Sequence, residues 1–220
     1  MGIGRRSFLK YMQLAMAGYA VDPLKAVSLY DNVYLNKKLG IMCSKPEGWG
    51  YIHVQDFGEL KSKQIIGELL EETSSEIFEA LEDPICVMTK YFVDTPENIG
   101  LFSPTITVNV TPKEEMASQG YVTIEDVIWA SRIGVSNILK DFKVIKEYDP
   151  YELSKCKFYE FDAEYVFEHL ELESPLKVEL KVFKAENNGY YYDFNCHQCR
   201  AQNEVADAEF EAFKQSIKLL

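Results

Sequence analysis

Two runs of alternating apolar and polar residues flank the strongest turn signal in the chain, within Leu176–Cys199. They constrain the fold more than any other feature of the sequence. In each run the apolar residues occupy every second position, which is typical of a half-buried β-strand. The two runs therefore predict a β-hairpin.

The turn between the runs contains an Asn-Gly pair that ends at Gly189. A two-residue turn would place Val182 opposite Asn195, so that an apolar and a polar side chain would share one face of the hairpin. A three-residue loop with Gly189 in the left-handed conformation instead places Val182 opposite Phe194. We therefore predict the three-residue loop.

The same periodicities predict the other elements. Strands are expected at 39–44, 51–55, 85–93, 104–110, 142–147 and 156–168. Helical spacing predicts helices within 61–81, after Thr123 and after Asp207. Thr123 and Asp207 are residue types that commonly cap the N-terminus of a helix.

Together these elements predict an α+β fold: an α/β/α sandwich in which helices flank a mostly antiparallel sheet of about six to seven strands. In 156–168 the alternate residues Tyr159, Phe161, Tyr165 and Phe167 share one face of the strand. We expect the acidic residues that alternate with them, such as Glu160 and Asp162, to face solvent. A chain of 220 residues, 47% of them hydrophobic, can form one sizeable core, so we expect residues 30–220 to form a single domain.

The net charge of −12 argues against nucleic-acid binding, because neutralising phosphates requires a basic surface. Binding to an anionic membrane is disfavoured for the same reason. No segment approaches the roughly 18 apolar residues of a membrane-spanning helix. The five cysteines are an odd number, so in an oxidising compartment one thiol would stay unpaired or be joined to another chain.

The first 20 residues differ chemically from the rest, because they are basic and contain no acidic residue. A twin-arginine export motif is matched, except at its first position, by Arg5, Arg6, Phe8, Leu9 and Lys10, and a short, mildly hydrophobic stretch follows. We therefore predict an export leader at 1–20 and a periplasmic or other extracytoplasmic location. The alternative is an amphipathic N-terminal helix retained in a cytoplasmic protein.

Several predicted segments follow one another in a characteristic order: a strand over 39–46 followed by Trp49, the strand Thr105–Pro112, a helix that begins at 123–127, a return strand at 189–192, and a terminal helix around Phe210. In this order and spacing they resemble the PsbP-like family, over most of residues 30–220. The resemblance implies a non-catalytic accessory or protein-binding module that docks onto a protein partner, here as an exported bacterial relative. It implies no catalytic residues and no cofactor.

The segment Cys196-His197-Gln198-Cys199 is the sharpest candidate for chemistry, because two thiols and an imidazole within four residues can bind zinc or form a redox pair. On a continuing strand, however, Cys196 and Cys199 would point to opposite faces about 10 Å apart, too far for a disulfide or a shared metal. We therefore favour Cys196 in the core and Cys199 at a strand end. A metal-binding or thiol-redox protein is the alternative, and a small-ligand carrier with a pocket between sheet and helices is another.

Two aromatic residues are candidate partner contacts. Trp49 lies at a strand turn, and alternation turns Tyr191 away from its neighbours Tyr190 and Tyr192, so that we expect an aromatic residue to be exposed on each sheet face.

The remaining histidines that we considered, His53 and His169, have no identifiable arrangement with a nucleophile or carboxylate. The sequence thus favours a protein without enzymatic activity.

Overall fold

The computed structural model describes residues 27–30, 32–52, 84–91, 98, 101–168, 172, 174–202 and 206–220. The leader predicted at 1–20, the helix predicted within 61–81, and the histidines His53 and His169 lie outside the described residues. None of the helices within the described ranges has the length and apolarity needed to cross a lipid bilayer.

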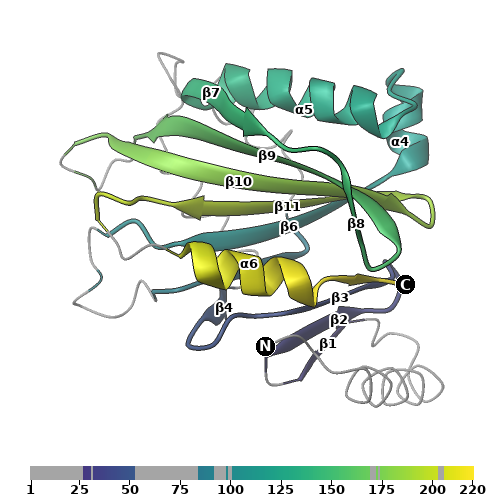
Figure 1. The fold of residues 1–220 in the computed structure, drawn as a ribbon, viewed down its shortest axis with the longest axis horizontal. Helices are drawn as coiled ribbons and strands as arrows, with labels where there is room; N and C mark the ends of the chain where they lie inside the picture. Colours follow the sequence, from purple (N-terminus) through teal and green to yellow (C-terminus); the bar gives the residue numbers. More distant parts are fainter. Residues whose placement is uncertain are drawn as a thin grey trace.

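The predicted hairpin lies inside a large antiparallel sheet, which we call the main sheet (Figure 1). From one edge to the other its strands are β4 (Gly50–Ile52), β5 (Cys86–Thr89), β6 (Thr105–Pro112), β11 (Tyr190–Gln198), β10 (Leu176–Asn187), β9 (Cys156–Phe167) and β7 (Lys140–Glu147). A short strand, β8 (Tyr151–Leu153), also pairs with β9. The predicted strands at 104–110, 142–147 and 156–168 are confirmed.

A second, four-stranded antiparallel sheet was not predicted. Its strands in order are β1 (Val27–Tyr30), β2 (Val33–Asn36), β3 (Ile41–Ser44) and β12 (Lys218–Leu219). The two strands expected at 39–44 and 51–55 therefore belong to different sheets, because the turn between them carries the chain from the small sheet into β4 of the main sheet.

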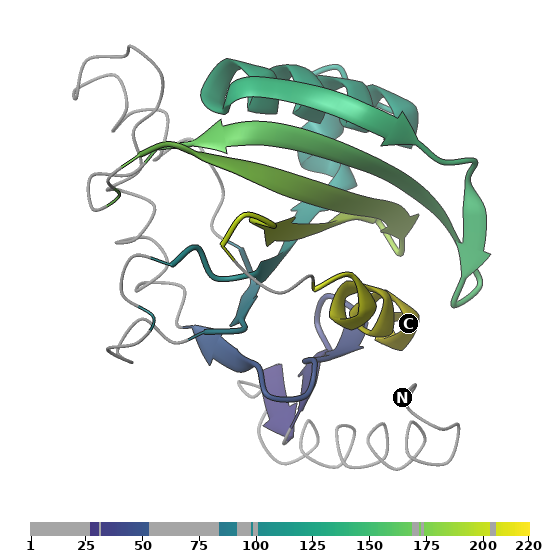
Figure 2. The ribbon, with the colours of Figure 1, turned by 60° about the vertical axis from the view of Figure 1, so that its left-hand side comes forward.

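Three helices occur in the described residues: α4 (Lys113–Ser118), α5 (Ile124–Ile138) and α6 (Asp207–Ser216). α5 lies on one side of the main sheet, whereas α6 and the small sheet lie on the other (Figures 1 and 2). Thr123 caps α5 as predicted: its hydroxyl accepts a hydrogen bond from the Asp126 amide (3.1 Å), and the Asp126 carboxylate accepts one from the Thr123 amide (2.9 Å). The protein has an α+β fold with helices on both faces of the sheet, as predicted.

Each face of the main sheet carries its own hydrophobic core. The core beneath α6 and the small sheet includes Phe183 of β10, Phe194 of β11 and Phe210 of α6. The core beneath α5 includes Leu180 of β10 and Ile128 of α5. Neighbouring residues of one strand can therefore both be buried, on opposite faces.

The predicted three-residue hairpin loop was wrong. The turn between β10 and β11 has two residues, Asn188 and Gly189, both with positive φ (46° and 82°), as in a type I′ turn. Val182 consequently lies opposite Asn195. The prediction assumed that the hairpin has a single apolar face, whereas Val182 packs in the core beneath α5 and Phe183 packs in the opposite core.

Candidate functional site

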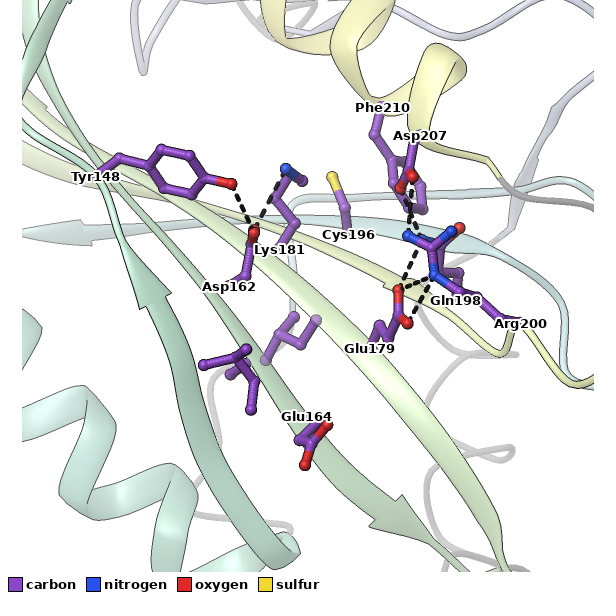
Figure 3. Close-up of a pocket in the computed structure, with 13 residues that line it drawn as sticks. Tyr148, Asp162, Glu164, Glu179, Lys181, Cys196, Gln198, Arg200, Asp207 and Phe210 are labelled. Atoms are coloured by element: carbon purple, nitrogen blue, oxygen red, sulfur yellow. Dashed lines mark hydrogen bonds and ion pairs between the residues drawn. The ribbon is translucent and has the colours of Figure 1, made fainter.

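A groove of about 370 Å³ lies on the α6 side of the main sheet, beside the start of α6 (Figure 3). We call it the sheet groove. Strands β7, β9, β10 and β11 contribute to it, and its lining mixes charged, polar and apolar residues: Ile145, Tyr148, Asp162, Ala163, Glu164, Glu179, Leu180, Lys181, Cys196, Gln198, Arg200, Asp207 and Phe210.

Asp162 and Lys181 form the first polar cluster of the sheet groove. Asp162 accepts a hydrogen bond from the Tyr148 hydroxyl (2.7 Å), and its other oxygen pairs with Lys181 Nζ at 3.3 Å. Burial opposes the charge on Lys181, but Asp162 and neighbouring acidic groups outweigh burial and raise the pKa of Lys181. The lysine therefore stays positively charged.

Glu160 was predicted to face solvent, and this was wrong, because only 6% of it is exposed. Lys214 of α6 pairs with it at 3.3 Å and Lys181 at 3.6 Å. α6 covers this part of β9, and the two cations compensate the buried carboxylate. These ion pairs hold α6 against β9 beside the sheet groove.

Arg200 forms the second polar cluster, which connects the end of β11 to α6 (Figure 3). Its Nε donates to both carboxylate oxygens of Glu179 at 2.6 Å, and its Nη2 donates to Asp207 at 2.8 Å. The Gln198 amide also donates to Glu179 (3.2 Å) and to Asp207 (2.8 Å).

Asp207 was predicted to cap α6, and this was wrong. The N-cap residue is Ala206, which makes no side-chain cap, and Asp207 is the first helical residue. Burial opposes ionisation of Asp207, but hydrogen bonds from Arg200 and Gln198 outweigh burial and lower the pKa of its carboxyl group. The ionised carboxylate therefore accepts hydrogen bonds from Arg200 and Gln198 in the second polar cluster instead of capping the helix.

The charges and the thiol in the sheet groove favour non-covalent binding. Four carboxylates and two cationic side chains line it, and Lys177, which lies outside the lining, pairs with Glu164 at 2.6 Å. Burial raises the pKa of the Cys196 thiol, so the thiol stays protonated and is a weak nucleophile.

The structure does not bring the predicted metal or redox residues together. Cys196 is fully buried in the core beneath α6, whereas His197 points to the other face, where its Nδ1 lies 3.1 Å from the Tyr165 hydroxyl in the core beneath α5. Cys199 is a buried free thiol just after β11, within electrostatic range of the same Tyr165. Cys196 and His197 thus lie on opposite faces of the sheet, so the structure does not support the alternative metal or redox site formed by Cys196, His197 and Cys199.

The two candidate partner contacts, Trp49 and Tyr191, are both buried, at 3% and 5% exposure. Trp49 packs edge to face on Phe210 of α6, with ring centroids 5.9 Å apart. The Tyr191 hydroxyl donates to the Val122 carbonyl at 2.9 Å. The expectation that Tyr191 would be exposed was wrong, because the segment that leads into α5 covers this face of β11.

An exposed apolar surface lies instead on the outer side of α5. It consists of Val122 just before the helix, Trp129 and Ile133, which are 70%, 61% and 42% exposed, and we call it the α5 stripe. At 100° per residue, these positions fall within an arc of roughly 40° on the helix surface. They lie opposite the buried residues Ile124 and Val127. Sequence reasoning assigned only the buried side of this helix, although the same helical spacing could have revealed the second apolar face.

The export motif residues Arg5, Arg6, Phe8, Leu9 and Lys10 lie outside the described residues.

No family model matches this chain, and no curated protein matches it at a significant level. Solved structures that resemble this chain in part include LpqN of Mycobacterium tuberculosis, involved in cell envelope biogenesis, which is 11% identical, with 81% of this chain and 82% of that chain covered and a TM-score of 0.47. The cyanobacterial PsbP of Synechocystis sp. PCC 6803 is 12% identical, with 90% of this chain and 100% of that chain covered and a TM-score of 0.45. PA94, a Pseudomonas aeruginosa protein of unknown function, is 16% identical, with 52% and 69% covered and a TM-score of 0.38. Similarity at this level does not establish a family or a shared function.

Proposed function

We propose that the protein is a non-catalytic, protein-binding accessory module that is exported to the cell envelope, with residues 1–20 as its leader and residues 30–220 as the binding module. The α5 stripe is the observation that carries the binding part of this proposal. Trp129 is 61% exposed, and tryptophan is among the residues most enriched at the centres of protein interfaces.

The α5 stripe is held in place before any partner binds. The capping box of Thr123 and Asp126 fixes the start of α5, and Ile124, Val127 and Ile128 anchor its inner side. A rigid helix loses little conformational entropy on binding. The partner that fits an apolar helix face is a protein with a hydrophobic groove.

Site-specific photo-crosslinking in growing cells tests the binding proposal. A photoreactive phenylalanine analogue at position 129 or 133 should give one discrete adduct. The same analogue at Gln119, which is exposed beyond the end of α4, serves as the matched control. Equal adducts from all three positions, or none from the stripe, would refute the binding surface.

The export part of the proposal rests on the twin-arginine motif at Arg5 and Arg6. Changing both to Lys preserves the charge but should leave the protein in the cytoplasmic fraction, whereas the unchanged chain should appear in the periplasmic fraction. Export of the double Lys variant in a strain without other export routes would contradict this part.

A further inference from the structure

We infer that the partner of the α5 stripe is a protein whose hydrophobic groove carries lysine or arginine side chains on its two rims, beside the pocket that receives Trp129. This inference rests on the proposed function and deepens it, because it states the charge of the surface that the same helix face would bind. The apolar part of that face is Val122, Trp129 and Ile133.

Two carboxylates flank the α5 stripe, and we call them the flanking carboxylates. At 100° per residue, Glu125 lies about 40° from Trp129 on one side of it, and Asp126 lies about 60° from it on the other. They precede Trp129 by four and three residues, and side chains at these spacings are neighbours on a helix. A groove that encloses Trp129 therefore brings each of its rims close to a carboxylate.

Both flanking carboxylates are ionised and can bind a cation. Glu125 is exposed and Asp126 is partly exposed. The Tyr159 hydroxyl donates to Glu125 at 2.6 Å and lowers the pKa of its carboxyl group. The Thr123 amide donates to Asp126 at 2.9 Å and lowers its pKa in the same way. Within the described part of the chain neither carboxylate forms an ion pair, and since a carboxylate has about four lone-pair sites, each can accept a further donor.

The basic side chains nearest to the stripe are directed elsewhere. Arg132 lies over the Phe161 ring, 4.5 Å from its centroid, and pairs with Glu147 at 3.0 Å. Lys157 acts on the flanking carboxylates only over a distance, because its ammonium group lies over the Tyr159 ring, 4.7 Å from the centroid. The surface that a partner meets beside Trp129 is therefore acidic.

This charge favours a protein over a lipid surface as the occupant. An amphipathic helix that lies on an anionic bilayer is rich in lysine and arginine on its polar face, whereas carboxylates flank the α5 stripe in a chain whose net charge is −12. Anionic headgroups would repel this face. The same charge attracts a basic rim and increases its association rate.

The test uses Glu125→Gln and the protein that is crosslinked at position 129. The substitution removes one flanking charge and keeps an acceptor for the Tyr159 hydroxyl. In low salt we expect association to slow about threefold to tenfold, while dissociation changes less than about twofold. The difference should disappear at about 0.5 M salt, where charges are screened.

The matched control is Glu47→Gln, which removes the same charge from the exposed turn between β3 and β4. This turn adjoins β4 at one edge of the main sheet, whereas α5 contacts β7 at the opposite edge. The control variant should associate at the rate of the unchanged chain. Circular dichroism should show the same fold for both variants.

Three outcomes would overturn the inference. If Glu125→Gln associated as fast as Glu47→Gln in low salt while Trp129→Ala still weakened binding, the partner would lack a basic rim but the protein-binding function would stand. Insertion into vesicles of phosphatidylglycerol and phosphatidylethanolamine, seen as a blue shift of tryptophan fluorescence that Trp129→Phe abolishes, would make lipid the occupant. Absence of any adduct at position 129 would remove the binding surface and this inference with it.

Discussion

The substitution Trp129→Ala tests whether the Trp129 side chain binds a partner protein or stabilises the fold. Trp129 is 61% exposed, and a tryptophan side chain presents up to roughly 250 Å², so about 150 Å² is available to a partner. At about 25 cal/mol per Å², full burial is worth almost 4 kcal/mol. Fixing the side chain costs about 1 kcal/mol, which leaves about 3 kcal/mol, or a loss of affinity on the order of 100-fold in Trp129→Ala.

The assay compares two quantities for the same variant. The dissociation constant for the partner identified by crosslinking should rise by about two orders of magnitude, whereas the free energy of unfolding in urea should change by less than about 0.5 kcal/mol, as expected for an exposed side chain. The control is Ile145→Ala, which removes another exposed apolar side chain (52%) from the edge strand β7. It should leave partner affinity unchanged.

Two results would refute the reasoning. If Trp129→Ala lowered the free energy of unfolding by about 2 kcal/mol or more, Trp129 would be a packing residue. If its partner affinity matched that of Ile145→Ala, the α5 stripe would not be the interface.

Three further predictions concern the fold. Trp49→Ala should lower the free energy of unfolding by about 3–5 kcal/mol in urea titrations, since Trp49 is buried against Phe210; a loss below about 1 kcal/mol would contradict this packing. Burial lowers the pKa of His197 to about 4, below its usual value near 6.5. The free energy of unfolding should therefore be highest above pH 6.5 and fall by up to about 3 kcal/mol as the pH drops to 4, because the unfolded chain binds the proton first. His197→Gln should flatten that part of the pH profile, and an unchanged slope would argue against a neutral His197. Gly189→Ala should cost about 1–2 kcal/mol in urea titrations because φ is +82°, and a neutral effect would mean a different turn.

The sequence was most informative where local chemistry decides the structure. Thr123 and Asp126 form the predicted helix start through their own hydrogen bonds. The alternation in 156–168 correctly predicts that Phe161 and Tyr165 share one buried face of β9, although Phe158 packs in the opposite core. Both signals depend on residues close together in the chain.

The errors arose where distant segments decide burial. Periodicity gives the two faces of a strand but not what covers each face, so Glu160 was expected in solvent although Lys214 of α6 reaches it. The hairpin register failed for the same reason, because a sheet covered on both sides buries Val182 and Phe183 on opposite faces. Trp129 was not predicted as a surface residue, because helical periodicity identifies the side of α5 that faces the sheet and Trp129 lies on the outer side.

The central claim is that a partner protein covers Trp129. The chain contains two tryptophans, one buried at position 49 and one exposed at position 129, so fluorine NMR of protein labelled with 5-fluorotryptophan gives one resonance for each, and Trp129→Phe assigns them. On addition of the partner, the Trp129 resonance should shift or broaden and lose its sensitivity to solvent isotope, while the Trp49 resonance should stay in place. An unchanged Trp129 resonance in a saturated complex would contradict the claim.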